Sequence, residues 1–256
     1  MIVAQLSDLH FVRPGQLHFG IDTAATTRAA VEHLNAMDPG PDAVVVTGDI
    51  ADSGSVEQYE EARGVLDLLR SPYYVVPGNH DRREALKAAF RGHLGEDRSG
   101  FVQYAVADRA LRLVALDTLS EGESCGRLDG ARLAWLDETL AAQPDRPTLV
   151  FMHHPPFMTG IEWMDEQGLK DRGGLDTVLA RHPHVRLVAC GHVHRSASAT
   201  IGHARVAMAP STTGAVGLSL GGREPTFGPE PFACLVHVLL DDRVVTHTTF
   251  VGVTTP

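Results

Sequence analysis

Cysteine, long apolar runs and basic charge are all scarce in this sequence, and each scarcity excludes a class of protein. The three cysteines, Cys125, Cys190 and Cys234, show neither a metal-binding spacing nor a CxxC pair, and a low, odd count is typical of a reducing compartment. No run of about 18 apolar residues occurs, so we expect no transmembrane helix. The net charge of −10 argues against binding to a nucleic-acid polymer, which requires a basic surface.

The N-terminus also lacks the basic and long apolar segments of a secretory signal peptide. The candidate functional residues begin at Asp8, and cleavage of such a peptide would remove them. We therefore expect a cytoplasmic protein with no membrane partner. With 256 residues, 43% of them hydrophobic, the chain is long enough to bury the core of a single domain. Small anionic substrates remain possible because bound metals can reverse the local charge.

Short β-rich runs alternate with amphipathic stretches through the first ninety residues, and this order is typical of a parallel sheet. Segments 155–174 and 211–231 are expected to be long loops, and loops of such length are usually functional. Met158, Trp163 and Met164 form either a lid or the core of the first loop. The patterns predict helices over 23–37, 55–69, 82–90, 129–142 and 175–182, and strands over 4–6, 43–46, 72–78, 101–107, 111–116, 148–152, 185–190, 196–201, 204–208, 234–240 and 243–250.

Five of the predicted strands run directly into Asp, Asn or His residues. Such residues would cost several kcal/mol each if they were buried without partners. In open α/β sheets, ligands bind at the carboxyl ends of the strands, so five such ends predict one polar cluster. The residues at these ends are Asp8 and His10, Asp49, Asn79-His80-Asp81, His153-His154, and His192 and His194.

The donor types in this cluster indicate a metal centre. Three carboxylate or amide donors and four imidazoles are too many for one ion that keeps an open position. They suit two ions about 3.5–4 Å apart that share a carboxylate. Mixed nitrogen and oxygen donors without thiolate fit divalent Fe, Mn, Zn or Co. The candidate ligands are Asp8, His10, Asp49, Asn79, His153, His192 and His194.

Each candidate taken alone has a simpler interpretation. A lone His10 is more often a surface or core residue, Asn79 after Pro-Gly is most often a turn residue, and Asp49 could cap a helix. Their joint occurrence at five strand ends favours the metal centre. His154 remains an alternative to His153. The other histidines, His18 among them, are expected to serve packing or surface roles.

The same residues resemble the signature blocks of a known family. Asp8-x-His10, Gly48-Asp49, Gly78-Asn79-His80-Asp81, His153-x-Pro155 and Gly191-His192-x-His194 resemble the five blocks of calcineurin-like metallophosphoesterases, in the same order and over about residues 1–210. His153-His154-Pro155-Pro156, Cys190–Arg195 and Ala209–Thr212 are similar to bacterial class III cyclic-nucleotide phosphodiesterases and related glycerophosphodiesterases. Arg82 departs from the pattern, because many relatives carry an acidic residue there. The resemblance implies a four-layered α/β sandwich of two mixed sheets.

The resemblance also implies a role for each residue. Asp49 would bridge the two ions; Asp8, His10 and His194 would complete the first site, and Asn79, His153 and His192 the second. A hydroxide between the ions would attack phosphorus in line. His80 would contact the phosphate and protonate the leaving group, and Asp81 would orient a neighbouring group.

The function implied is hydrolysis of small phosphodiesters, with 3′,5′-cyclic nucleotides preferred and glycerophosphodiesters or broad small diesters as the alternative. A protein Ser/Thr phosphatase is disfavoured for two reasons. Residues Gly48–Ser53 lack the Gly-Asp-x-Val-Asp-Arg pattern of that branch, and the third block ends in Asp81 where that branch has Glu. A metal-free scaffold is disfavoured because every ligand is present. We expect a catalytic core over residues 1–210 and a segment over 211–256 that completes a sheet and contributes to a homodimer or larger homo-oligomer.

Overall fold

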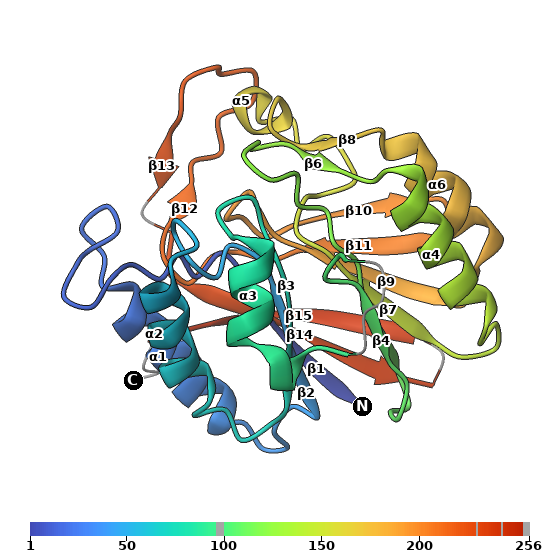
Figure 1. Cartoon of the computed structure of the whole chain (residues 1–256), viewed down its shortest axis with the longest axis horizontal. Helices are drawn as coiled ribbons and strands as arrows, with labels where there is room; N and C mark the ends of the chain where they lie inside the picture. The colour runs from blue at the N-terminus through green and yellow to red at the C-terminus, as the bar shows by residue number, and fades with distance from the viewer. Residues whose placement is uncertain (96–99, 229, 242, 253–256) are drawn as a thin grey trace.

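The computed structural model describes residues 1–95, 100–228, 230–241 and 243–252, and its strands form two large mixed sheets packed face to face (Figure 1). A continuous core lies between them, since side chains from both sheets, such as Val45 and Leu149, belong to one buried cluster. Helices cover the outer faces, so the predicted four-layered sandwich is confirmed. In the described part of the chain, no helix is both long and apolar enough to cross a bilayer.

The first sheet has the order β15-β14-β1-β2-β3. β1, β2 and β3 run parallel, while β14 pairs antiparallel with both β1 and β15. The C-terminal strand β14 therefore lies directly beside the first strand of the chain, and β15 forms the edge next to it. The bounds are β1 Ile2–Leu6, β2 Ala43–Thr47, β3 Tyr73–Val76, β14 Ala233–Leu240 and β15 Arg243–Phe250.

The second sheet has the order β10-β11-β9-β7-β5-β4. Its central strands β11, β9, β7 and β5 are parallel, and an antiparallel strand closes each side. The parallel strands β7 and β9 thus place their carboxyl ends at the same edge. The bounds are β4 Tyr104–Val106, β5 Arg112–Ala115, β7 Thr148–Phe151, β9 Val185–Cys190, β10 Ala197–Ile201 and β11 Ala204–Met208.

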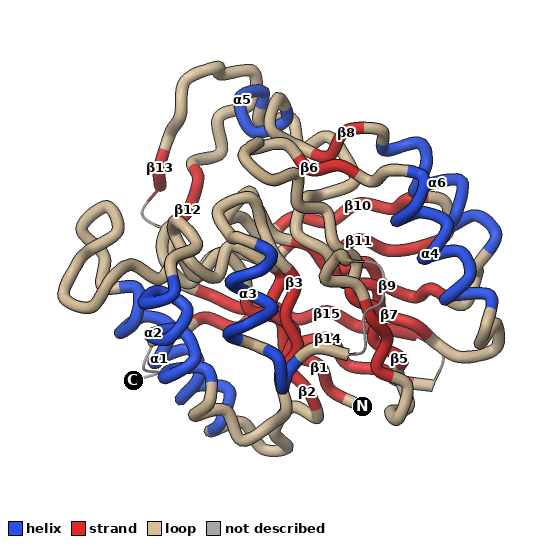
Figure 2. The backbone as a smooth tube through the Cα atoms, in the orientation of Figure 1, coloured by secondary structure: helices blue, strands red, loops and turns tan. Residues whose placement is uncertain are grey.

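Two groups of helices form the outer layers (Figure 2). α1, α2 and α3 cover the first sheet, and α4 and α6 cover the second. Ser55 caps α2 with the predicted box, because its hydroxyl accepts from the Gln58 backbone while the Gln58 side chain accepts from the Ser55 backbone. The bounds are α1 Thr23–Asn35, α2 Val56–Leu66, α3 Arg83–Ala89, a 3₁₀ turn Arg91–His93, α4 Gly130–Ala141, α5 Glu162–Asp165 and α6 Arg172–Arg181.

The structure differs from the sequence predictions at the start of one helix and within the two predicted loops. α6 begins at Arg172 rather than Leu175, because packing of the helix overrides the low helix propensity of Gly173 and Gly174. Both predicted loops contain short strands: β8 Leu169–Lys170 in the first pairs with β6 Gly126–Arg127, which precedes α4, and β12 Ala215–Val216 in the second pairs with β13 Phe227–Gly228. Within the predicted segment 211–256, residues 229, 242 and 253–256 lie outside the described residues.

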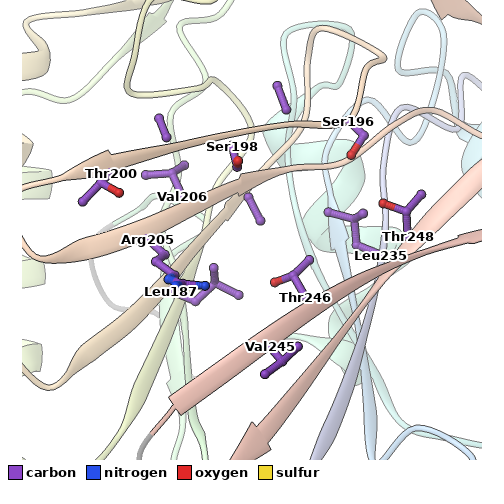
Figure 3. A pocket seen from close by; sticks show the side chains of 13 residues that line it. Leu187, Ser196, Ser198, Thr200, Arg205, Val206, Leu235, Val245, Thr246 and Thr248 are labelled. Carbon is purple, nitrogen blue, oxygen red and sulfur yellow. The ribbon is translucent and has the colours of Figure 1, made fainter.

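The sandwich is open along the edge formed by β10 and β15. A cavity of about 680 Å³ lies there between β10 and β11 on one side and β14 and β15 on the other. Small polar side chains such as Ser198, Thr246 and Thr248 line it together with Arg205 (Figure 3). None of the described residues that line this cavity is a candidate metal ligand.

Candidate metal centre

The candidate ligands meet at the carboxyl ends of β1, β2, β3, β7 and β9, as the sequence predicts for parallel strands. The chain turns sharply after several of these strands. Of the eight described non-glycine residues with positive φ, five are candidate ligands. Left-handed backbone is strained for such residues and gathers at functional sites. The five are Asp8, His10, Asp49, His192 and His194.

A first group of donors faces one side of the Asp49 carboxylate. His10 Nε2 lies 3.0 Å from His194 Nε2 and 3.7 Å from Asp49 Oδ2. His194 Nε2 lies 3.6 Å from Asp8 Oδ1. The Asp8 carboxylate is held by the backbone N–H of His192, at 3.0 and 3.1 Å. These four side chains therefore converge on one small volume.

A second group faces the other side of the same carboxylate. His153 Nε2 lies 3.4 Å from Asp49 Oδ2 and 3.1 Å from Asn79 Oδ1. His192 Nδ1 lies 3.0 Å from Asn79 Oδ1 and 3.2 Å from His153 Nε2. Asp49 thus contacts both groups through Oδ2, and it is the residue best placed to be shared.

Hydrogen bonds on the outer ring nitrogens leave electron pairs that point into the cluster. His153 Nδ1 donates to the Thr47 carbonyl at 2.7 Å, and His194 Nδ1 donates to the Gly214 carbonyl at 3.1 Å. In its neutral form, each of these rings therefore presents an unprotonated Nε2 to its neighbours. Acceptors that converge at about 3 Å repel one another unless a cation lies between them. The donor set fits two metal ions.

The protonation states of the buried rings agree with this fit. Burial lowers the pKa of His10 and His194 to about 4 and that of His192 to about 3, so all three are neutral near pH 7. Neutral imidazole is the form that binds metal. Burial opposes the charge on His153, but the charge and hydrogen bond of the Asp49 carboxylate, together with Asp8 and the Thr47 carbonyl, outweigh it and raise the His153 pKa to about 9. A cation beside Asp49 would take the place of that proton.

Two glycines allow the backbone to approach Asp49. A Cβ atom on Gly78 would overlap the Asp49 carboxylate, and a Cβ atom on Gly48 would overlap the His153 ring. Gly48 also has φ 89°, which side-chain-bearing residues rarely adopt. The Gly-Asp and Gly-Asn spacings in the sequence therefore reflect close packing around one carboxylate.

His80 and Asp81 lie in the same loop but face different surroundings. The His80 side chain is 41% exposed, its backbone N–H donates to Asp49 Oδ1 at 2.9 Å, and its Nδ1 donates to the Asp52 carbonyl at 2.7 Å. Asp81 is fully buried and accepts from the backbone N–H groups of Gly78 and Ala51 at 2.8 and 3.0 Å. His80 is therefore open to a ligand, whereas Asp81 ties two ligand-bearing loops together.

Two neighbours of the cluster were not predicted from the sequence. His18 was expected to serve packing or surface roles, but its ring stacks on His10 with centroids 4.8 Å apart and its Nδ1 lies 3.1 Å from Asp52 Oδ1. Asp52 Oδ1 also lies 3.7 Å from His10 Nδ1. A signal for Asp52 was available in its position three residues after Asp49. His18 depends on the path of an irregular loop.

His154 was left open as an alternative to His153. Its Nδ1 lies 2.8 Å from Thr118 Oγ1, and its Nε2 lies 3.2 Å from the Ser124 carbonyl. Both ring nitrogens are therefore engaged away from Asp49, although the ring lies 4.6 Å from that of His192. The geometry favours His153 as the ligand and places His154 behind His192.

Comparison with known proteins agrees with this geometry. A family model of calcineurin-like phosphoesterases matches residues 1–196, which is more than half of the chain. The chain belongs to the calcineurin-like phosphoesterase family. It is therefore an enzyme that hydrolyses phosphate esters, and the family resemblance proposed from the sequence blocks is confirmed.

Individual relatives extend the comparison. The chain is 36% identical to a protein of Arcobacter nitrofigilis named "Probable glycerophosphodiester phosphodiesterase GpdQ", over 98% of this chain and 94% of that one. It is 31% identical to the 3′,5′-cyclic adenosine monophosphate phosphodiesterase CpdA of Escherichia coli K12, over 82% of this chain and 75% of that one. A solved dimetal phosphatase from Danio rerio has the same fold, with a TM-score of 0.72 and 17% identity. The match covers 97% of this chain and 95% of that one.

Proposed function

We propose that this phosphoesterase is a binuclear metal-dependent phosphodiesterase that acts on small phosphodiesters. The observation that carries the proposal is the placement of Asp49 between two groups of donors, at 3.7 Å from His10 and 3.4 Å from His153. Two bound ions, of Fe, Mn, Zn or Co, would supply the hydroxide nucleophile and neutralise charge on the phosphoryl oxygens. Asp8, His10 and His194 would hold the first ion, and Asn79, His153 and His192 would hold the second.

His80 is proposed as the group that protonates the leaving oxygen. Its Nδ1 is fixed by the Asp52 carbonyl, so Nε2 is the nitrogen that can face a substrate. Burial opposes a charge on this ring, but the Asp49 carboxylate, the hydrogen bond to the Asp52 carbonyl and the carboxylates of Asp52 and Asp81 together outweigh it and raise the His80 pKa above its ordinary value. A raised pKa keeps more of the imidazolium present near neutral pH, which is the form a general acid requires.

Preference for a diester over a monoester follows from the charges around the cluster. A monoester carries nearly two negative charges, and dedicated monoesterases often provide a cationic clamp for the second. Arg195 follows the last ligand block, but its guanidinium donates to the Val216 carbonyl and to Glu230, both at 2.6 Å. It is therefore engaged within the chain, and a diester with one negative charge suits the site better.

Within the diesters, we propose 3′,5′-cyclic nucleotides as the substrate class. Glycerophosphodiesters are the second candidate, because the glycerophosphodiesterase-named relative aligns over nearly the whole of both chains. The CpdA relative, named for cyclic adenosine monophosphate, supports the first. An assay of cyclic AMP and glycerophosphoethanolamine at equal concentrations, with the metals defined, separates the two candidates.

The diester preference gives a direct prediction. The purified, metal-loaded enzyme is expected to cleave bis(p-nitrophenyl) phosphate with a higher kcat/KM than p-nitrophenyl phosphate. The reason is that the diester carries one negative charge and needs no clamp for a second, while both esters release the same p-nitrophenolate. The absorbance of the released p-nitrophenolate measures both rates in one buffer. A clear preference for the monoester would overturn the phosphodiesterase proposal.

We also propose that the chain forms a homodimer through its C-terminal strands. β15 pairs only with β14 among the described strands, and it presents exposed residues such as Val245 and Phe250. An edge strand of eight residues offers unpaired backbone groups to another copy. Light scattering coupled to size exclusion at micromolar concentration is expected to give twice the chain mass. A mass of 27.5 kDa, that of one chain, would reject the dimer.

A further inference from the structure

Two exposed aromatic side chains lie together beside the metal cluster. Phe19 is 81% exposed and Phe227 is 67% exposed, and their ring centroids are 5.8 Å apart. They come from the loop after β1 and from β13, which are more than two hundred residues apart in the chain. Because both rings remain mostly in solvent, their contact with each other contributes little buried apolar area to folding.

Phe19 is fixed to the first group of candidate ligands through His18. The His18 ring lies 4.5 Å from that of Phe19 and stacks on that of His10 at 4.8 Å with an angle of 11° between the planes. His18 is held in turn by Asp52 and by two backbone hydrogen bonds with Ile21, both 2.9 Å. Two ring contacts, from Phe19 to His18 and from His18 to His10, therefore connect Phe19 to a proposed ligand of the first ion.

The backbone of Phe19 is strained. Its φ is 46°, in the left-handed region, where a bulky residue is a rare outlier and glycine would be favoured. The next residue is Gly20, also at positive φ, so the turn itself tolerates glycine. The aromatic side chain at position 19 is therefore kept at a cost in backbone strain, which is typical of functional sites.

The strand that carries Phe227 is linked to the same group of candidate ligands. It pairs with Val216 in the β12–β13 ribbon, and the Val216 carbonyl accepts from Arg195, the residue after His194. The Gly214 carbonyl at the start of this ribbon accepts from His194 Nδ1. Contacts therefore lead from Phe19 to His10 and from the strand that carries Phe227 to His194. The β12–β13 ribbon lies at one end of the molecule (Figure 1).

We propose that Phe19 and Phe227 form a stacking subsite for a flat aromatic group of the substrate, such as the base of a cyclic nucleotide. Exposed aromatic faces attract nucleobases by stacking, without regard to base identity. A glycerophosphodiester has no planar group to place there. The inference rests on the proposed function and sharpens it, because it assigns the discrimination between the two candidate substrates to two named residues.

Substitution of the rings tests the subsite. Phe19→Leu and Phe227→Leu keep apolar bulk and remove the stacking face, and each is expected to raise KM for cyclic AMP by about 5- to 100-fold with a smaller change in kcat. KM for glycerophosphoethanolamine should stay within about twofold of wild type. Phe19→Tyr keeps an aromatic face, so its KM for cyclic AMP should stay close to that of wild type. Leu68→Ala, at an exposed apolar residue after α2, is the matched control and should change neither substrate.

Stability separates a binding role from a structural one. Phe19→Gly relieves the left-handed backbone, so its melting temperature is expected to equal or exceed that of wild type while KM for cyclic AMP rises. A fall in melting temperature together with equal KM increases for both substrates would assign Phe19 to loop structure and overturn the proposal. Unchanged KM values in all Phe19 and Phe227 variants would overturn it as well.

Equilibrium binding distinguishes failure of the subsite from failure of the proposed function. Calorimetry on the metal-loaded protein should show AMP binding at least about fivefold more tightly than ribose 5-phosphate, with the difference lost in Phe19→Leu. If no diester is hydrolysed but this difference is found, the subsite stands and the phosphodiesterase proposal fails. If diesters are hydrolysed and AMP binds no more tightly than ribose 5-phosphate, the phosphodiesterase proposal stands and the subsite fails.

Discussion

Replacing Asp49 with alanine is expected to lower kcat/KM for bis(p-nitrophenyl) phosphate by at least about 10³-fold. The reason is that its carboxylate lies within 3.7 Å of His10 Nε2 and 3.4 Å of His153 Nε2, so one substitution removes a ligand from both proposed ions. It also removes the negative charge that holds the pKa of His153 at about 9. Initial rates with saturating metal measure the loss.

A matched carboxylate serves as the control for this variant. Asp137→Ala removes a surface ion pair with Arg181 and His182, far from the ligand-bearing strand ends, and should leave kcat/KM within about twofold. Circular dichroism spectra of both variants should match wild type. An Asp49→Ala protein that is folded and retains more than about a tenth of the activity would contradict the shared-ligand assignment.

The second large effect concerns His80 and depends on the leaving group. His80→Ala is expected to lower kcat for cyclic AMP by about 10²–10⁴-fold, because an alkoxide leaves slowly unless it is protonated. The loss on bis(p-nitrophenyl) phosphate should be at least about tenfold smaller, since p-nitrophenolate leaves without help. The ratio of the two losses, measured in the same preparation, is the readout.

The leaving-group ratio also guards against an indirect effect on the metals. His203→Ala replaces an exposed histidine whose Nε2 contacts the His182 carbonyl, and it should change neither rate. Metal content of His80→Ala should equal that of wild type. Equal losses on both diesters would remove His80 from the acid role and assign it to phosphate binding or to support of the loop.

Much of the candidate site could be predicted from the sequence because its residues directly follow predicted strands. Asp8, Asp49, Asn79, His153 and His192 each follow a short apolar run, and parallel strands bring their carboxyl ends together whatever the loops do. The capping box at the start of α2 is likewise local, because it depends on side chains three residues apart. Such features can be read from neighbouring residues alone.

Contacts made by loops could not be predicted in this way. His18 reaches His10 only because the irregular loop before α1 folds back on the cluster, and no local pattern specifies that path. The β12–β13 ribbon has two residues in each strand, too few for an alternating pattern. The ribbon is held by two hydrogen bonds, from Arg195 to the Val216 carbonyl and from His194 to the Gly214 carbonyl. Both bonds join residues that are distant in sequence, so no local pattern predicts them.

The measurement that tests the central claim most directly is metal content. Plasma mass spectrometry of wild-type protein, reconstituted with one metal and freed of excess, is expected to give about two ions per chain. Asn79→Ala should lose the second ion first, because Asn79 Oδ1 contacts His153 and His192 of the second group. Asp49→Ala should hold neither ion tightly. One ion or none in the wild type, or full occupancy in Asp49→Ala, would contradict the account.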